Sequence, residues 1–157
     1  MQKWNLGTTD PLSLTLAADA RFSTLDYGND HIWELEMAGG EPLAINLRTT
    51  FGLRARAMRI FPSFSEGELS VSDPAAFLDP PRITAFYANF LEISFSPLKD
   101  ITVILEYWIP DSHTVTSRIT LKNSGTEERI IGLELAAVLS PIDGEIFKPE
   151  KIQGVNI

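Results

Sequence analysis

The sequence predicts an all-β protein in which antiparallel strands pack as a β-sandwich of about eight to ten strands or more. Two observations predict this class. Apolar and polar residues alternate along most of the chain after residue 30, as they do in strands that bury one face. Turn-forming residues recur between these segments, and no long stretch shows the 3.6-residue period of an amphipathic helix.

The best-defined early segment is a hairpin. Trp33, Leu35 and Met37 alternate with glutamates, so residues 33–37 are predicted to form a strand. Residues 38–42 contain two glycines and a proline and predict a turn. Residues 43–51 then resume the alternation and complete the hairpin. Before it, residues 13–16 are the best candidate for a strand.

The middle of the chain carries more turn residues. Residues 53–61 predict a strand that ends early at Pro62 and Ser63, followed by a loop over 63–67 and a short strand over 68–71. Asp73 before Pro74 predicts one helical turn, because Asp caps helix starts and Pro fits the first helical position.

The second half of the chain alternates more regularly. Within residues 101–109, Tyr107 falls on the apolar face and Trp108 on the opposite face, beside Glu106. The face that carries Trp108 contacts solvent, another domain, or a further layer of a multi-layer sandwich. Five strands are predicted in this half: 83–88, 91–95, 101–109, 115–121 and 131–139.

Length, charge and composition limit the function. The chain of 157 residues suits one domain, residues 1–157. Its net charge of -8 repels phosphate backbones, so we expect no nucleic-acid partner. No segment approaches the roughly 20 apolar residues of a membrane helix, and the first residues lack a signal-peptide core. With no cysteine in the chain, we expect a cytoplasmic protein without a membrane partner.

Catalytic constellations are not predicted. Residues 111–113 read Asp-Ser-His, but triads are assembled from positions that are distant in sequence. His31 and His113 are the two histidines, which is a poor start for a zinc site. Glu34 and Glu36 share a strand face about 7 Å apart, and a solvated face explains them best. We therefore expect no catalytic residue, no metal ligand and no cofactor.

Aromatic residues are the better candidates for binding. Exposed rings on a β-sandwich can stack on sugar rings, whose axial C–H faces are apolar. Trp33 and Trp108 are candidate platforms of this kind, and His113 lies in a loop near the second. We therefore name Trp33, Trp108 and His113 as candidate ligand-binding residues.

Residues 118–135 contain a strand that ends in Leu-Lys-Asn, a Ser-Gly-Thr-Glu-Glu turn and a strand of alternating aliphatic residues. This hairpin resembles one in the N-terminal β-sandwich (supersandwich) domains that precede (α/α)6-barrel glycoside hydrolases and glycoside phosphorylases. It is also similar to hairpins of many immunoglobulin-like sandwiches. Residues 30–61 resemble the first strands of the supersandwich domains, so the resemblance spans residues 30–157 in pattern.

The resemblance implies a galactose mutarotase-like sandwich whose catalytic acid and base lie in a separate helical domain. The chain would then be a non-catalytic accessory domain, the N-terminal part of a longer protein. Its partners would be the helical catalytic domain of the parent chain and a carbohydrate. Two alternatives stay open: a freestanding carbohydrate-binding module, and a protein-interaction sandwich that forms a homodimer.

Overall fold

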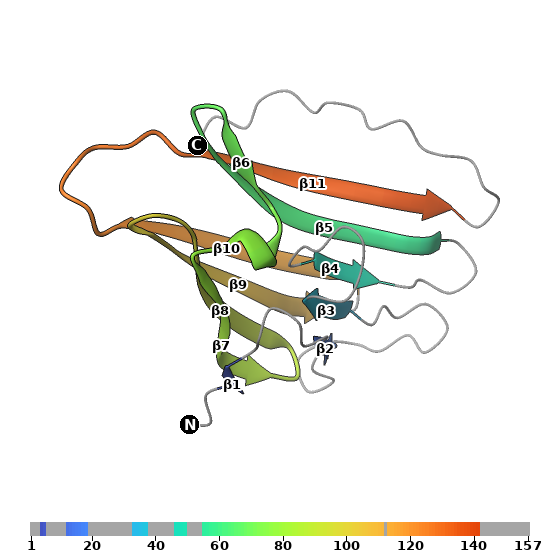
Figure 1. Cartoon of the computed structure of the whole chain (residues 1–157). Helices are drawn as coiled ribbons and strands as arrows, with labels where there is room; N and C mark the ends of the chain where they lie inside the picture. The colour runs from blue at the N-terminus through green and yellow to red at the C-terminus, as the bar shows by residue number, and fades with distance from the viewer. Residues whose placement is uncertain are drawn as a thin grey trace.

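The computed structural model describes residues 4–5, 12–18, 33–37, 46–49, 55–111 and 113–141. These residues form an all-β sandwich of two antiparallel sheets (Figure 1). Within these described ranges, a 3-10 turn, η1 (Pro74–Ala76), lies between strands β6 and β7. The described strands are β1 (Trp4–Asn5), β2 (Leu12–Leu16), β3 (Trp33–Met37), β4 (Asn46–Thr49), β5 (Ala55–Glu66), β6 (Leu69–Val71), β7 (Asp79–Tyr87), β8 (Phe90–Leu98), β9 (Ile101–Asp111), β10 (Thr114–Asn123) and β11 (Gly132–Pro141).

The two sheets differ in how their strands are connected along the chain. The five-stranded sheet has the order β1-β7-β8-β9-β10, in which four consecutive strands form a meander of hairpins. The six-stranded sheet has the order β11-β5-β4-β3-β2, and β6 pairs with the end of β5. The last strand, β11, therefore returns to pair with a strand from the middle of the chain.

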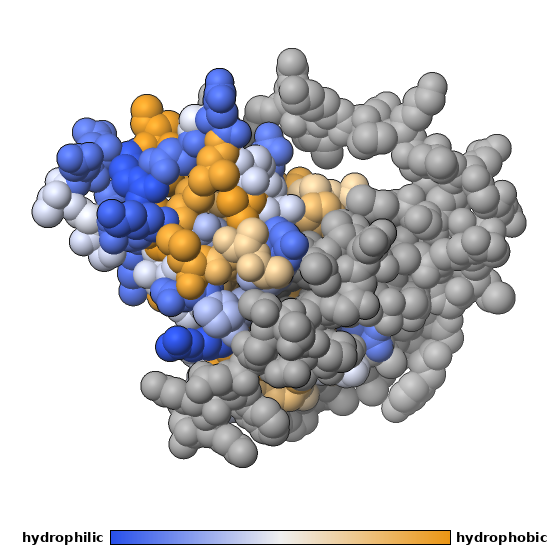
Figure 2. Space-filling model, in the orientation of Figure 1, coloured by the Kyte–Doolittle hydropathy of each residue, from blue (hydrophilic) through white to orange (hydrophobic). Residues whose placement is uncertain are grey.

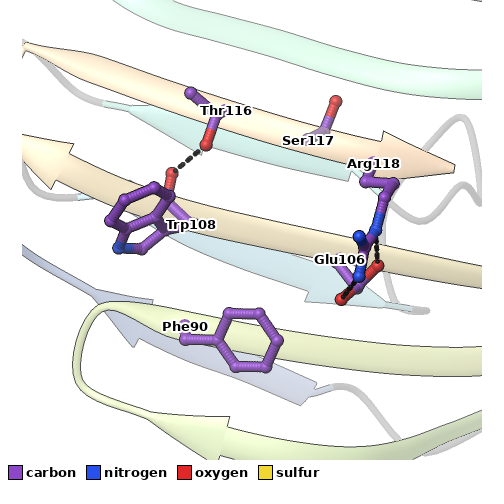
Figure 3. Close-up of a pocket in the computed structure, with 6 residues that line it drawn as sticks. All are labelled: Phe90, Glu106, Trp108, Thr116, Ser117 and Arg118. Carbon is purple, nitrogen blue, oxygen red and sulfur yellow. Dashed lines mark hydrogen bonds and ion pairs between the residues drawn. The ribbon is translucent and has the colours of Figure 1, made fainter.

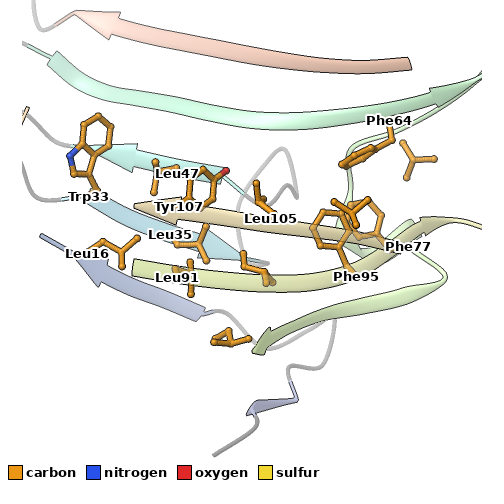
Figure 4. Packing of buried hydrophobic residues seen from close by; sticks show 14 of the residues in the cluster. Leu16, Trp33, Leu35, Leu47, Phe64, Phe77, Leu91, Phe95, Leu105 and Tyr107 are labelled. Carbon is orange, nitrogen blue, oxygen red and sulfur yellow. The ribbon is translucent and has the colours of Figure 1, made fainter. Parts of the chain in front are cut away.

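The core lies between the sheets and follows directly from the alternation. On β9, every odd-numbered residue from Ile101 to Ile109 is buried, and the residues between them face outward. Phe95 on β8 stacks on Phe77 with ring centroids 5.0 Å apart, and it meets the edge of Phe64 on β5 at 5.7 Å. Figure 4 shows these rings packed at one end of the buried cluster. One continuous apolar layer thus joins both sheets.

Several sequence predictions are confirmed. The strand at residues 33–37 pairs antiparallel with β4, and Trp33 and Leu35 are buried. Asp73 caps η1, because its Oδ1 accepts a hydrogen bond of 2.8 Å from the amide of Ala75. Residues 38–45 and 50–54, which complete the predicted hairpin, lie outside the described residues, as does His31.

The predicted end of the strand at Pro62 is wrong. Strand β5 continues through Pro62 and Ser63 to Glu66, so the predicted loop over 63–67 reduces to a turn at Gly67, which has a φ of +58°. One edge of β5 pairs with β4 up to Ile60 and with β6 from Phe64 onward. Pro62 lies between the part of β5 that pairs with β4 and the part that pairs with β6. Because no strand pairs with it on this edge, its missing N–H removes no hydrogen bond there.

Polar contacts tie the two sheets together at both ends of β8. Arg129, in the connection from β10 to β11, donates to both carboxylate oxygens of Glu66 on β5, with Nε 2.7 Å from Oε1. Its Nη1 also donates to the carbonyl of Lys99 in the β8–β9 turn. At the other end, the amide of Ala17 donates to the carbonyl of Ala88 at 2.8 Å. Hydrogen bonding from Arg129 lowers the pKa of Glu66.

Replacing Phe95 by alanine should destabilise the protein by about 3–5 kcal/mol, because the change removes two ring contacts and leaves a cavity between the sheets. Urea unfolding followed by intrinsic fluorescence measures the loss. Phe86→Ala is the matched control, since Phe86 is partly exposed on β7 and its loss should cost only about 1–2 kcal/mol. Equal losses in the two variants would contradict this description of the core.

Candidate functional site

The outer face of the five-stranded sheet carries the candidate site. Tyr107 is buried, and Trp108 points away from the core with 51% of its surface exposed, as the alternation predicts. No further layer of the described chain covers Trp108.

An aromatic row crosses three strands of this face. The register places Tyr87 on β7 opposite Phe90 on β8, and Phe90 opposite Trp108 on β9. The rings of Tyr87 and Phe90 lie 6.3 Å apart between centroids. Thr116 on β10 follows in the same register and donates a hydrogen bond of 3.1 Å to the carbonyl of Trp108. We call Tyr87, Phe90 and Trp108 the aromatic row.

A charged row runs beside the aromatic row, two residues along each strand. It joins Glu92 on β8, Glu106 on β9 and Arg118 on β10. Arg118 binds both carboxylate oxygens of Glu106, with Nη2 2.7 Å from Oε1. Thr84 on β7 donates to Oε1 of Glu92 at 2.5 Å. We call Glu92, Glu106 and Arg118 the charged row.

The ion pair fixes the electrostatics of this face. The Glu106 side chain is only 14% exposed, whereas the Arg118 side chain is 75% exposed. Hydrogen bonding from Arg118 lowers the pKa of Glu106 and in turn raises the pKa of the guanidinium. Glu106 therefore stays ionised and holds Arg118 in place, while the remaining N–H groups of Arg118 face solvent.

A groove of about 400 Å³ lies where the two rows meet. Figure 3 shows Trp108 and the Glu106–Arg118 pair at opposite ends of this group, with Phe90 on the neighbouring strand. The groove combines apolar ring surface with fixed hydrogen-bonding groups. It can therefore hold a molecule that has both an apolar face and polar edges. Its lining residues are Phe90, Glu106, Trp108, Thr116, Ser117 and Arg118.

The other two sequence candidates lie elsewhere. Trp33 is 3% exposed in the core, where it offers no surface to a ligand, because it shares the buried face of β3 with Leu35. His113 is exposed in the turn between β9 and β10, and its amide donates to Oδ1 of Asp111 at 2.9 Å. That bond contributes most to the lowered pKa of Asp111. The structure thus brings neither Trp33 nor His113 into the groove that Trp108 lines.

A second hollow is built from turns. Its lining residues are Lys99, Asp100, Gly125, Thr126, Glu127 and Arg129. The neighbouring Asn123 accepts from the amide of Gly125 at 2.9 Å and donates to the carbonyl of Glu127 at 2.7 Å. The carbonyl of Asp100, a residue with φ +58°, accepts from the amide of Ser124 at 2.8 Å. These bonds stabilise the turns and leave the outer-face groove as the better candidate.

No family model, curated protein or solved structure matches this chain. The part of the chain that the structure describes contains no candidate membrane-spanning helix. Among the same residues, no group of three His, Cys, Asp or Glu side chains is placed to hold a metal ion.

Replacing Arg118 by methionine should raise the pKa of Glu106 toward its ordinary value, because the hydrogen bond from the guanidinium is its main depressing influence. Carboxyl ¹³C shifts of Glu106, followed by NMR from pH 2 to 7, measure the change. Lys122→Met removes a positive charge from the far part of β10 and should leave this titration nearly unchanged. The same midpoint in all three proteins would contradict the ion pair.

Proposed function

We propose that this chain is a non-catalytic carbohydrate-binding β-sandwich and that its ligand binds on the outer face of the five-stranded sheet. The observation that carries the proposal is the aromatic row beside the charged row, with a groove where they meet. A sugar ring matches this arrangement, since its C–H face can stack on an aromatic ring while its hydroxyls reach charged side chains.

The charges of the face support an uncharged ligand. The charged row contains two carboxylates and one guanidinium, and the whole chain has a net charge of -8. A field of this sign disfavours phosphate and other anions. Sugar hydroxyls donate to carboxylates and accept from Arg118, whose side chain is largely exposed. Affinities of about 1 mM to 1 μM, or about -4 to -8 kcal/mol, fit an open site of this kind.

The ion pair with Arg118 argues against Glu106 as the acid of a glycoside hydrolase. Glu92 and Glu106 lie opposite each other, and glycoside hydrolysis also uses a pair of carboxyl groups. One member of such a pair must be a protonated acid, which requires a raised pKa. The pKa of Glu106 is lowered by Arg118 instead. This favours an electrostatic and positioning role for Glu106.

An exposed apolar strip supports the wider proposal of an accessory domain that packs on a helical catalytic domain. Leu133 on β11 pairs with the buried Phe64, so it lies on the inner face of its sheet, yet it is 41% exposed. Leu135 on the same face is 56% exposed, and Leu69 on β6 is exposed as well. In Figure 2, apolar side chains gather over β6 and η1. A partner domain would cover such a strip.

Trp108→Ala should weaken carbohydrate binding by about tenfold or more, because it removes the most exposed ring that lines the groove. NMR titrations with a panel of α- and β-linked oligosaccharides measure it through amide shifts. Phe86→Ala is the control, since Phe86 pairs with the buried Leu91 and does not share the outer face. A well-dispersed spectrum with no localised shift at millimolar sugar would exclude carbohydrate binding by this chain.

The double variant Leu133→Glu/Leu135→Lys should lower binding of a hydrophobic dye such as ANS by the folded protein, because it removes two exposed apolar side chains from the strip. Glu134→Gln, on the opposite face of β11, is the control and should leave dye binding nearly unchanged. Sedimentation of the unmodified chain shows whether a homodimer covers the strip instead. Unchanged dye fluorescence in the double variant would contradict an exposed docking strip.

A further inference from the structure

We propose that the site takes a linear, uncharged oligosaccharide of at least three sugar units, which lies across the strands instead of along them. This inference rests on the proposed function and adds the length and direction of the ligand. It is carried by the register that aligns Tyr87, Phe90 and Trp108.

The direction follows from where the rings lie. Neighbouring strands are separated by about 4.8 Å, so Tyr87 on β7 and Trp108 on β9 are separated by about 10 Å across the sheet. A single pyranose ring is about as long as one such gap and cannot contact both ends of the row. Along the strands, the outward neighbours of these rings are Glu92 on β8 and Glu106 on β9 on one side, and Pro110 on β9 on the other. The row of aromatic rings itself therefore runs across the strands.

The minimum length follows from the same spacing. One sugar over Trp108, a second over Phe90 and a third over Tyr87 would use the whole row. Tyr87 is 62% exposed at the end of β7, and Thr116 beyond Trp108 is a small, exposed residue. Neither blocks the row, so a longer chain can extend past both ends. The face thus fits an internal stretch of an unbranched chain.

The charged row fixes which edge of the ligand is bound. It runs parallel to the aromatic row on one side, so hydroxyls along one edge of the stacked sugars would face Glu92, Glu106 and Arg118. Arg118 uses Nε and Nη2 for Glu106 and keeps its other N–H donors for the ligand. An acidic sugar would meet two carboxylates here, whereas an uncharged sugar meets hydrogen-bonding partners only.

Calorimetric titration with cello-oligosaccharides and malto-oligosaccharides of one to six units tests this inference. We expect affinity in at least one series to rise about three- to tenfold from the disaccharide to the tetrasaccharide and then to level off. Tyr87→Ala should reduce tetrasaccharide affinity to that of the disaccharide and leave the disaccharide unchanged. Tyr87→Phe keeps the ring and should retain the wild-type pattern, and Trp108→Ala should weaken both lengths.

The outcomes separate this inference from the proposed function. If the disaccharide binds as tightly as the tetrasaccharide, or if Tyr87→Ala weakens both equally, the extended site is wrong while carbohydrate binding stands. If an oligogalacturonide of the same length binds more tightly than the uncharged sugars, the charge assignment is wrong. If neither uncharged series binds the unmodified protein, the proposed function is wrong. This inference, which rests on it, is then wrong as well.

Discussion

The register of β8, β9 and β10 is the constraint on which the rest of the structure depends. Because side chains alternate along each strand, one alignment both buries Leu105 and Tyr107 between the sheets and brings Phe90 opposite Trp108 outside. A shift by one residue would reverse every face of a strand at once. The apolar core therefore enforces the register, and the register builds the candidate site as a consequence.

Much of the fold is predictable because the alternation of apolar and polar residues indicates which side chains of each strand are buried. The sequence alone predicts the strands around Trp33 and Tyr107, and it predicts the capped turn at Asp73, because each depends on neighbouring residues. Strand β5 is different. Proline normally ends a strand, and the reason it does not do so at Pro62 is a change of partner from β4 to β6. That reason depends on tertiary pairing, which no local pattern contains.

The candidate site shows the same division. The outward direction of Trp108 follows from the alternation of β9, but its partners Phe90 and Tyr87 lie on other strands and become neighbours only through pairing. Arg118 joins Glu106 for the same reason. Trp33 is buried between the sheets, as its alternation with Leu35 already indicates. The face toward which a side chain points can thus be predicted from its own strand. Which residues become its neighbours on that face depends on how the strands pair.

The contact between Arg129 and Glu66 joins residues 63 positions apart in the sequence, and the β5–β11 ladder spans a similar separation. The meander from β7 to β10 needs only short loops, so its pairing carries a lower loop-closure cost. During synthesis, β5 emerges well before β11 and its 12-residue edge has no partner on that side until the ribosome has delivered residues 132–141. An open edge of that length is a template for pairing between nascent chains. The late return of β11 therefore leaves this edge of β5 unpaired for longer than the edges between the consecutive strands of the meander.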